Sequence, residues 1–315
     1  MGRVLVTRHL PDGGLDPLEE AGHDLIRRAD DTPYAQEELV ALAGTVDAVV
    51  CLLTDRIDDA VLRAGAAGRL KVVANVAVGY DNVDAATARQ LGVAVCNTPG
   101  VLDETTADLA FLLVLAASRL ASEAERDLRA GTWRGWGITQ YLGRDVHGAT
   151  LGLVGYGRIG RAVARRASGF GMQVLHHARS DTGVPGYTAS LDQLLAESDV
   201  VSLHVPLDNT TRHLIGRREL ACMRPHGVLV NTARGPVVDE EALAEALHDG
   251  TILAAGLDVF EREPLVHPRL LSAPRTVLLP HIGSASGATR TEMARVASRG
   301  VCEVLAGRTP ANLVP

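Results

Sequence analysis

The segment Gly155-Tyr156-Gly157-Arg158-Ile159-Gly160 decides the fold of this 315-residue chain. It follows the apolar run 150–154 and precedes a helix-forming run at 161–167. The first glycine permits a tight turn, the second lets a diphosphate approach the backbone, and the third lets the helix pack closely on the strand. The N-terminus of the helix adds free N–H donors and a favourable dipole. Although a plain tight turn looks similar, a strand before it and a helix after it predict dinucleotide binding.

The rest of the chain alternates short apolar, β-branched runs with helix-length amphipathic segments. This alternation predicts parallel strands joined by right-handed helical crossovers, and hence an α/β fold with two doubly wound parallel-sheet domains, one flavodoxin-like and one of the Rossmann type. We expect strands at 3–7, 48–52, 72–76, 93–96, 151–155, 174–177, 200–204, 228–231, 254–258 and 277–279.

The domain boundaries are expected at polar turns. Residues 97–100 form the first, and a capping box at 105–108 then predicts a helix over 109–120. A helical pattern at 293–304 has no strand after it, so we expect this helix to return to the first domain. Residues 1–99 and 285–315 would then form a substrate-binding domain, with residues 100–284 inserted as a dinucleotide-binding domain.

Composition disfavours several functional classes. A net charge of −7 and 3% aromatic residues favour neither nucleic acid nor a membrane surface as a partner. The longest apolar run, 109–117, is too short to span a bilayer, and the N-terminus begins a strand instead of a signal peptide. Because the cysteines are dispersed, we expect no metal site, no disulfide framework and a cytoplasmic location; they are Cys51, Cys96, Cys222 and Cys302.

Ala178, Arg179 and Ser180 occupy the place where NAD-preferring domains have an acidic residue for the ribose 2′-hydroxyl. No carboxylate is present to repel a 2′-phosphate, and a guanidinium and a hydroxyl are available to bind one. We therefore expect NADPH as the cofactor, with NADH possible. The alternative is a solvated loop in which Arg179 touches nothing.

Three polar residues follow strands in the second half of the middle domain: Arg234, Glu263 and His281. Ligands of open parallel sheets bind beyond the carboxyl ends of the strands, so all three are expected near the cofactor. A histidine can supply a proton to a carbonyl, a carboxylate can orient it, and an arginine can hold a substrate carboxylate. Each residue alone could be a turn, a solvated side chain or a helix-end partner; the ordered set predicts catalysis.

The chain strongly resembles the D-2-hydroxyacid dehydrogenase family. The shared motifs run in family order and are residues 78–84, Asn97-Thr-Pro-Gly100, the glycine loop, Asn231-Thr-Ala-Arg-Gly235, Gly256-Leu-Asp-Val-Phe260, Glu263-Pro264 and Pro280-His-Ile-Gly283. The glyoxylate/hydroxypyruvate reductase branch is most similar, on Cys51-Leu-Leu-Thr-Asp55, Asn75-Val-Ala-Val-Gly79, Trp133-Arg-Gly-Trp136 and Ala178-Arg179.

The resemblance implies that Arg234 binds the substrate carboxylate and carbonyl, Glu263 supports the histidine, and His281 donates or accepts the proton. It also implies that backbone N–H groups around Val76, Val78 and Gly79 bind the substrate carboxylate, and that Asp258 contacts the nicotinamide carboxamide. The expected cofactor contacts are Thr106, Gly155, Gly157, Arg158, Ile159, Gly160, Arg179, Ser180, Pro206, Thr232, Asp258 and Gly283. Family members are typically homodimers joined through the nucleotide-binding domains.

The expected activity is reduction of a small 2-oxo acid, glyoxylate or hydroxypyruvate, to the D-2-hydroxy acid. Ile138 and Gln140 depart from the branch pattern, so the choice of substrate side chain stays open. The alternatives are a D-2-hydroxyacid dehydrogenase for a larger substrate and a non-catalytic, dinucleotide-sensing binding protein of the same family.

Overall fold

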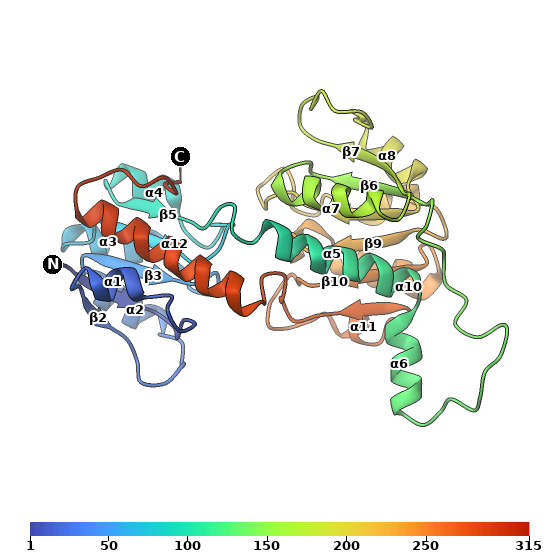
Figure 1. Cartoon of the computed structure of the whole chain (residues 1–315), viewed down its shortest axis with the longest axis horizontal. Helices are drawn as coiled ribbons and strands as arrows, with labels where there is room; N and C mark the ends of the chain where they lie inside the picture. The colour runs from blue at the N-terminus through green and yellow to red at the C-terminus, as the bar shows by residue number, and fades with distance from the viewer. Residues whose placement is uncertain (315) are drawn as a thin grey trace. The chain divides into compact units, whose positions relative to one another are not determined.

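The computed structural model describes residues 1–314, which form two compact units. The first unit is Met1–Leu102 together with the chain from Ser284, and the second unit is Asp103–Gly283. Each unit contains one parallel sheet covered by helices on both faces (Figure 1). This arrangement confirms the predicted α/β fold class. The assignment of substrate binding to one unit and dinucleotide binding to the other stays a prediction.

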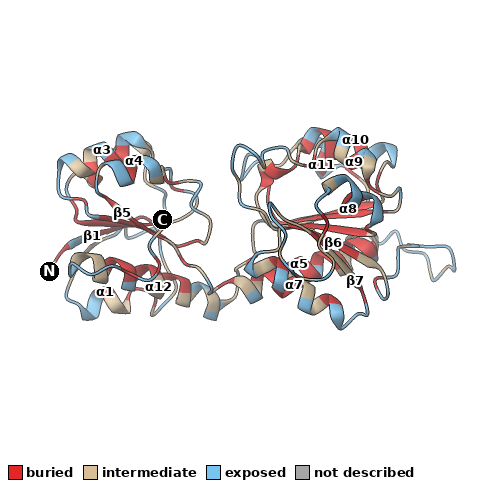
Figure 2. Ribbon diagram, turned by 90° about the horizontal axis from the view of Figure 1, so that it is seen from above, coloured by how far each residue is buried: buried red, intermediate tan, exposed pale blue. Residues whose placement is uncertain are grey.

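The first unit has a five-stranded sheet in the order β2-β1-β3-β4-β5, which is the flavodoxin-like order. Helices α2, α3 and α4 cover one face, and α1 and α12 cover the other (Figure 2). The final helix α12 packs against α1 and β4. The elements are β1 Arg3–Val6, α1 Asp16–Glu20, β2 Asp24–Ile26, α2 Gln36–Ala43, β3 Ala48–Cys51, α3 Asp59–Ala67, β4 Val72–Asn75, α4 Ala85–Gln90, β5 Ala94–Cys96 and α12 Gly287–Leu305.

The second unit has a six-stranded sheet in the order β11-β10-β9-β8-β6-β7. Helices α5 and α7 cover one face, and α8 to α11 cover the other (Figure 2). The elements are α5 Asp103–Ser118, α6 Ala121–Arg129, β6 Thr150–Val154, α7 Arg158–Ser168, β7 Gln173–His177, α8 Leu191–Glu197, β8 Val200–Leu203, α9 Arg217–Cys222, β9 Val228–Asn231, the 3₁₀ helix Gly235–Val237, α10 Glu240–Asp249, β10 Ala254–Leu257, α11 Pro268–Leu271 and β11 Thr276–Leu278.

The register of this sheet aligns the carboxyl ends of four neighbouring strands. Val154 pairs with Leu203, Leu203 with Asn231, and Asn231 with Leu257. The residues that follow these strand ends therefore lie along one edge of the sheet. Strand order also reverses at β6, whose neighbours are β7 on one side and β8 on the other, and such a reversal is where doubly wound sheets bind ligands.

Two expectations about local structure are wrong. The sequence pattern missed β2, because it is a three-residue edge strand with no buried residue. Helix α5 begins at Asp103, before the proposed capping box at 105–108. Its first turn instead carries the acidic residues Asp103 and Glu104, which favour a helix N-terminus through the helix dipole.

No single helix among residues 1–314 is long and apolar enough to cross a membrane; only α5 and α6 taken together, with a 70° bend between them, reach that length and composition.

Candidate active site

Glu263 and His281 form the central polar pair of the second unit. His281 Nδ1 lies 2.8 Å from Glu263 Oε2, and Glu263 Oε1 accepts a 2.9 Å hydrogen bond from the Phe260 N–H. Burial would raise the pKa of Glu263, but the bonds from His281 and Phe260 and the positive charge of Arg234 together lower it. Glu263 is therefore an ionised partner that fixes the imidazole ring. The sequence predicted that both residues lie near the cofactor, and the structure brings the two into contact.

The backbone of His281 is held in a conformation that side-chain-bearing residues rarely adopt. Its φ is +55°, and its N–H donates to the carbonyl of Asp258 at 2.8 Å. The Asp258 carboxylate accepts the next two N–H groups, from Ile282 at 2.7 Å and Gly283 at 2.8 Å. Burial raises the pKa of Asp258, and these N–H bonds oppose that rise. Left-handed strain at a non-glycine residue is typical of a functional position, and Asp258 holds the turn that imposes it.

Arg234 lies after β9 in a loop clamped by Asn231. The Asn231 side chain donates to the Arg234 carbonyl at 2.9 Å and accepts from the Ala233 N–H at 3.0 Å. The next residue, Gly235, is so close to Phe260 that an added Cβ would lie 1.9 Å from the Phe260 carbonyl carbon. Only glycine allows this approach, which brings the loop of Arg234 against the segment that carries Glu263. Arg234 thus lies within electrostatic range of Glu263, and its positive charge adds to the lowering of the pKa of that carboxyl by His281 and Phe260.

The glycine loop fits a dinucleotide diphosphate. Gly155 has a φ of +97°, and a Cβ there would lie 2.6 Å from the His204 carbonyl oxygen. A Cβ on Gly160 would lie 2.3 Å from the Gly155 carbonyl oxygen, whereas at Gly157 it would meet nothing within 4 Å. Helix α7 starts directly after Gly157 with no side-chain cap, which leaves its first-turn N–H groups for an anion. The loop is therefore closed toward the protein and open above Gly157, as diphosphate binding requires.

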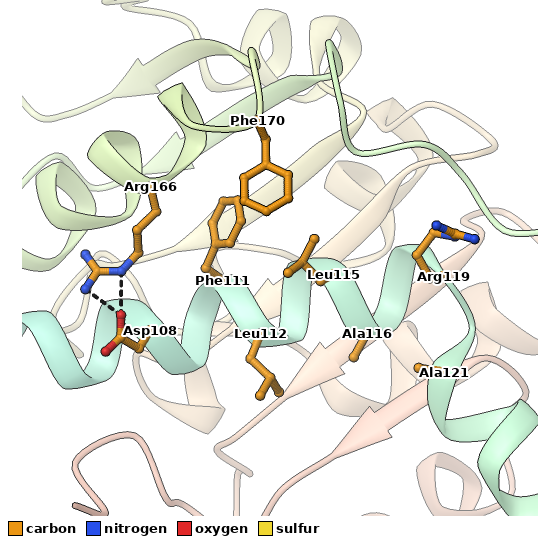
Figure 3. Close-up of a pocket in the computed structure, with 9 residues that line it drawn as sticks. All are labelled: Asp108, Phe111, Leu112, Leu115, Ala116, Arg119, Ala121, Arg166 and Phe170. Carbon is orange, nitrogen blue, oxygen red and sulfur yellow. Dashed lines mark hydrogen bonds and ion pairs between the residues drawn. The ribbon is translucent and has the colours of Figure 1, made fainter.

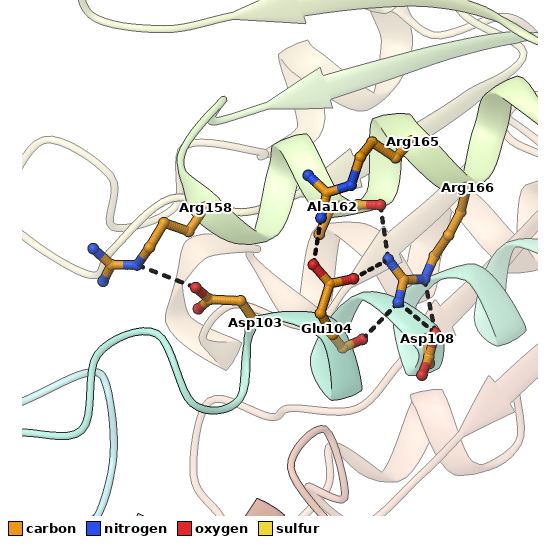
Figure 4. Close-up of polar contacts among 7 residues, drawn as sticks. All are labelled: Asp103, Glu104, Asp108, Arg158, Ala162, Arg165 and Arg166. Carbon is orange, nitrogen blue, oxygen red and sulfur yellow. Dashed lines mark hydrogen bonds and ion pairs between the residues drawn. The ribbon is translucent and has the colours of Figure 1, made fainter. Parts of the chain in front are cut away.

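Ion pairs between α5 and α7 fix the helix that begins at this loop (Figure 4). Arg158 lies 3.2 Å from Asp103, and Arg166 contacts Glu104 at 2.9 Å and Asp108 at 2.6 Å. Arg165 also pairs with Glu104. Because surface pairs act weakly one by one, their contribution here is the fixed orientation of α7 relative to α5.

The other predicted cofactor contacts fall into two groups. Thr106, Asp258 and Gly283 cluster together, since a Cβ on Gly283 would lie 3.2 Å from Asp258 Oδ2 and 3.5 Å from the Thr106 methyl. Thr232 follows the end of β9, and its buried hydroxyl has no hydrogen-bond partner within residues 1–314. The second group comprises residues in exposed loops: Arg179, Ser180 and Pro206. No cluster of acidic, cysteine and histidine residues in the described part of the chain is arranged to hold a metal ion.

In the first unit, the backbone carbonyl groups of the loop Val76–Gly79 accept hydrogen bonds that hold the loop in place. The Asn75 side chain donates to the Gly79 carbonyl at 2.8 Å, Asn97 donates to the Val78 carbonyl at 2.7 Å, and the Thr98 N–H donates to the Ala77 carbonyl at 2.9 Å. Within the described chain, the N–H groups of residues 77–79 have no such partner. Successive backbone N–H groups left in this way form a site for a carboxylate.

Sequence reasoning missed the asparagines that shape these loops. Asn75, Asn97 and Asn231 each bond to backbone groups at or next to a predicted substrate-binding segment. The available signal was the polar turn at 97–100 and the asparagine that ends β9, but neither revealed which carbonyl it would bind.

Comparison with known proteins agrees with this geometry. Residues 111–283 match the family model described as "D-isomer specific 2-hydroxyacid dehydrogenase, NAD binding domain". The glyoxylate reductase of Korarchaeum cryptofilum is 47% identical over 99% of this chain and 95% of its own length, and that of Thermococcus onnurineus is 44% identical over the same shares.

Solved structures give the same result. The TT0316 protein from Thermus thermophilus has a TM-score of 0.92 at 45% identity and covers 99% of this chain and 100% of its own. An NADPH-dependent glyoxylate/hydroxypyruvate reductase from Sinorhizobium meliloti, in complex with NADP and malonate, has a TM-score of 0.87 at 34% identity, covering 99% and 96%. The chain therefore belongs to the D-isomer specific 2-hydroxyacid dehydrogenase family.

Proposed function

We propose that this protein reduces a small 2-oxo acid, glyoxylate or hydroxypyruvate, to the D-2-hydroxy acid with NADPH. The observation that carries the proposal is the His281–Glu263 pair at 2.8 Å with Arg234 in electrostatic range. These residues supply a proton donor, its orienting carboxylate and a cation for a substrate carboxylate. The naming of the similar proteins as glyoxylate reductases supports a small substrate.

The chain's own residues divide the chemistry as follows. Bound NADPH would supply the hydride to the carbonyl carbon. Arg234 holds the substrate carboxylate and polarises the adjacent carbonyl through charge-assisted hydrogen bonds. Because Glu263 engages Nδ1 of His281, Nε2 is the atom left to give a proton to the carbonyl oxygen. The N–H groups of residues 77–79 are proposed as further contacts of the substrate carboxylate.

The preference for NADPH is supported by the segment after β7. Arg179 and Ser180 are exposed, and Ala178 stands where a carboxylate would repel a 2′-phosphate. The test is a steady-state comparison of NADPH and NADH with glyoxylate, hydroxypyruvate, pyruvate and a bulky 2-oxo acid. Higher kcat/KM with NADPH and the two small acids is expected. Higher efficiency with the bulky acid would favour the larger-substrate dehydrogenase, and higher efficiency with NADH would contradict the cofactor proposal.

We also propose a homodimer joined through the second unit. An apolar groove on α5 is lined by Phe111, Leu112 and Leu115 and bordered by Phe170 (Figure 3). Leu112 is 49% exposed, and four large apolar side chains are exposed in the segment after α6: Trp133, Trp136, Ile138 and Leu142. Such a surface is typical of a protein–protein interface. Light scattering should give twice the monomer mass, and Leu112→Glu should lower it; a monomeric native protein would contradict the proposal.

A cytoplasmic location is part of the same proposal. All four cysteines are free thiols, which fits a reducing compartment. Fractionation of cells that express the protein, with markers for each compartment, provides the test.

A further inference from the structure

His176, near the end of β7, is completely buried against the glycine loop. Its ring stacks on the ring of Tyr156, with centroids 3.8 Å apart and an angle of 20° between the planes. Tyr156 lies between the first two glycines of the loop proposed to bind the diphosphate. One face of the His176 imidazole is therefore packed against the loop that is proposed to bind the diphosphate.

The edge of the same ring holds the segment that follows β7. His176 Nε2 lies 2.6 Å from Thr182 Oγ1, and this oxygen also accepts the Val184 N–H at 3.3 Å. The His176 N–H donates to the Gly186 carbonyl at 2.8 Å. Residues 178–186, which include the exposed Arg179 and Ser180, are thus anchored to His176 in the middle, at Thr182, and at the end, at Gly186.

The direction of the His176–Thr182 hydrogen bond follows from the other ring nitrogen. Nδ1 is buried and has no partner within the described residues. An unpaired N–H in that position would cost more than an unpaired lone pair, so the proton belongs on Nε2 and is donated to Thr182. Burial lowers the pKa of His176, which keeps the ring in this neutral form. Thr182 is therefore an acceptor that fixes the loop.

We propose that His176 and Thr182 are positioning residues that set the preference for NADPH over NADH. The proposal rests on the proposed function, in which Arg179 and Ser180 bind the 2′-phosphate. Through its ring stack and its hydrogen bond, His176 links the loop for the diphosphate to the segment for the 2′-phosphate. NADP⁺ binding depends on that segment being held in place, whereas NAD⁺ has no 2′-phosphate to place there.

The test is calorimetric titration of the protein with NADP⁺ and NAD⁺, and with 2′,5′-ADP as a fragment that carries the 2′-phosphate. Thr182→Val removes the acceptor at nearly equal volume, and His176→Phe keeps the stacking ring but removes the donor. Each should raise the Kd for NADP⁺ and 2′,5′-ADP about five- to tenfold and change the Kd for NAD⁺ less than twofold. The double variant should match the weaker-binding single variant, because both remove one hydrogen bond.

Two controls separate this role from general loosening of the fold. Tyr187→Phe alters a neighbouring ring, whose centroid is 5.9 Å from that of His176, and should leave both Kd values unchanged. Thr182→Ser keeps the hydroxyl and should retain the native ratio of Kd values. If Thr182→Val and His176→Phe weaken the binding of NADP⁺ and NAD⁺ equally, or leave the ratio of the two Kd values unchanged, this inference is overturned. The NADPH proposal is unaffected by that result. A native protein that binds NAD⁺ as tightly as NADP⁺ would overturn the NADPH proposal and this inference together.

Discussion

His281 Nδ1 lies 2.8 Å from Glu263 Oε2, and the second oxygen of Glu263 is occupied by the Phe260 N–H. The hydrogen bond from Phe260 therefore fixes the carboxylate of Glu263, and this carboxylate orients the imidazole of His281. The opposite ring nitrogen, Nε2, is the proton donor that this arrangement provides.

Replacing His281 by alanine removes that donor. We expect the turnover number of His281→Ala to fall at least about 10²-fold, because general acid catalysis contributes about 10²–10⁴-fold. Cofactor affinity should change little. Steady-state kinetics and direct titration with NADP⁺ measure the two effects, with His248→Ala in the same unit as the matched control. Near-native turnover would remove His281 from the proton-transfer role.

Glu263→Gln should lower the turnover number, because it removes the charged partner of His281. Despite burial, the hydrogen bonds from His281 and Phe260 lower the pKa of Glu263, so its carboxylate is charged at neutral pH. Glutamine keeps the size of the side chain but offers the ring only a neutral amide. We expect turnover to fall about 10-fold, the equivalent of one hydrogen bond to a charged group, with the Kd for NADP⁺ unchanged. Near-native turnover would mean that Glu263 only packs beside the ring.

Arg234→Lys tests whether the substrate carboxylate is held by a planar, two-donor group. An ammonium keeps the charge but cannot reproduce the guanidinium fork. We expect kcat/KM for the 2-oxo acid to fall about 10- to 100-fold, with KM for NADPH nearly unchanged. Retention of native efficiency would show that charge alone suffices at this position.

How well a feature could be predicted from the sequence depends on how far apart in the chain the interacting residues lie. The grouping of Arg234, Glu263 and His281 was predictable because each follows an apolar strand, and parallel strands bring their carboxyl ends to one edge. The acidic first turn of α5 was a local signal for a start at Asp103, but the ion pairs of Asp103 and Glu104 with Arg158 and Arg166 were not predictable. Such pairs depend on the packing of two helices, which no local pattern encodes.

The hydrogen bonds of the asparagine side chains also join residues that are distant in the chain. The turn at 97–100 was visible as a polar cluster, yet its hydrogen bond joins Asn97 to the carbonyl of Val78, 19 residues earlier. An asparagine in a turn can bond to its own backbone two residues on, and nothing in the local sequence indicates a partner this far away. The left-handed backbone of His281 was equally hidden, because Asp258 imposes it from another strand end.

Asn97→Ala should weaken substrate binding without affecting the cofactor. It frees the Val78 carbonyl, so the loop whose N–H groups are proposed to bind the substrate carboxylate is no longer held. KM for the 2-oxo acid should rise about fivefold or more, equivalent to loss of about 1 kcal/mol, with KM for NADPH unchanged. The exposed Asn209→Ala is the matched control. Equal changes in both KM values would indicate general damage instead.

His204 should make the protein sensitive to mild acid. Burial lowers the pKa of His204 to about 4, while an unfolded histidine titrates near 6.5. Between these values the unfolded chain binds a proton that the folded chain does not, so the free energy of unfolding falls as the pH drops from about 6.5 to about 4. The loss attributable to His204 is at most about 3 kcal/mol. Urea unfolding at pH 7 and pH 4.5 measures it, and His204→Gln, which cannot titrate, should lose less stability between the two. If the native protein and His204→Gln lose stability equally, His204 is not the source of the acid sensitivity.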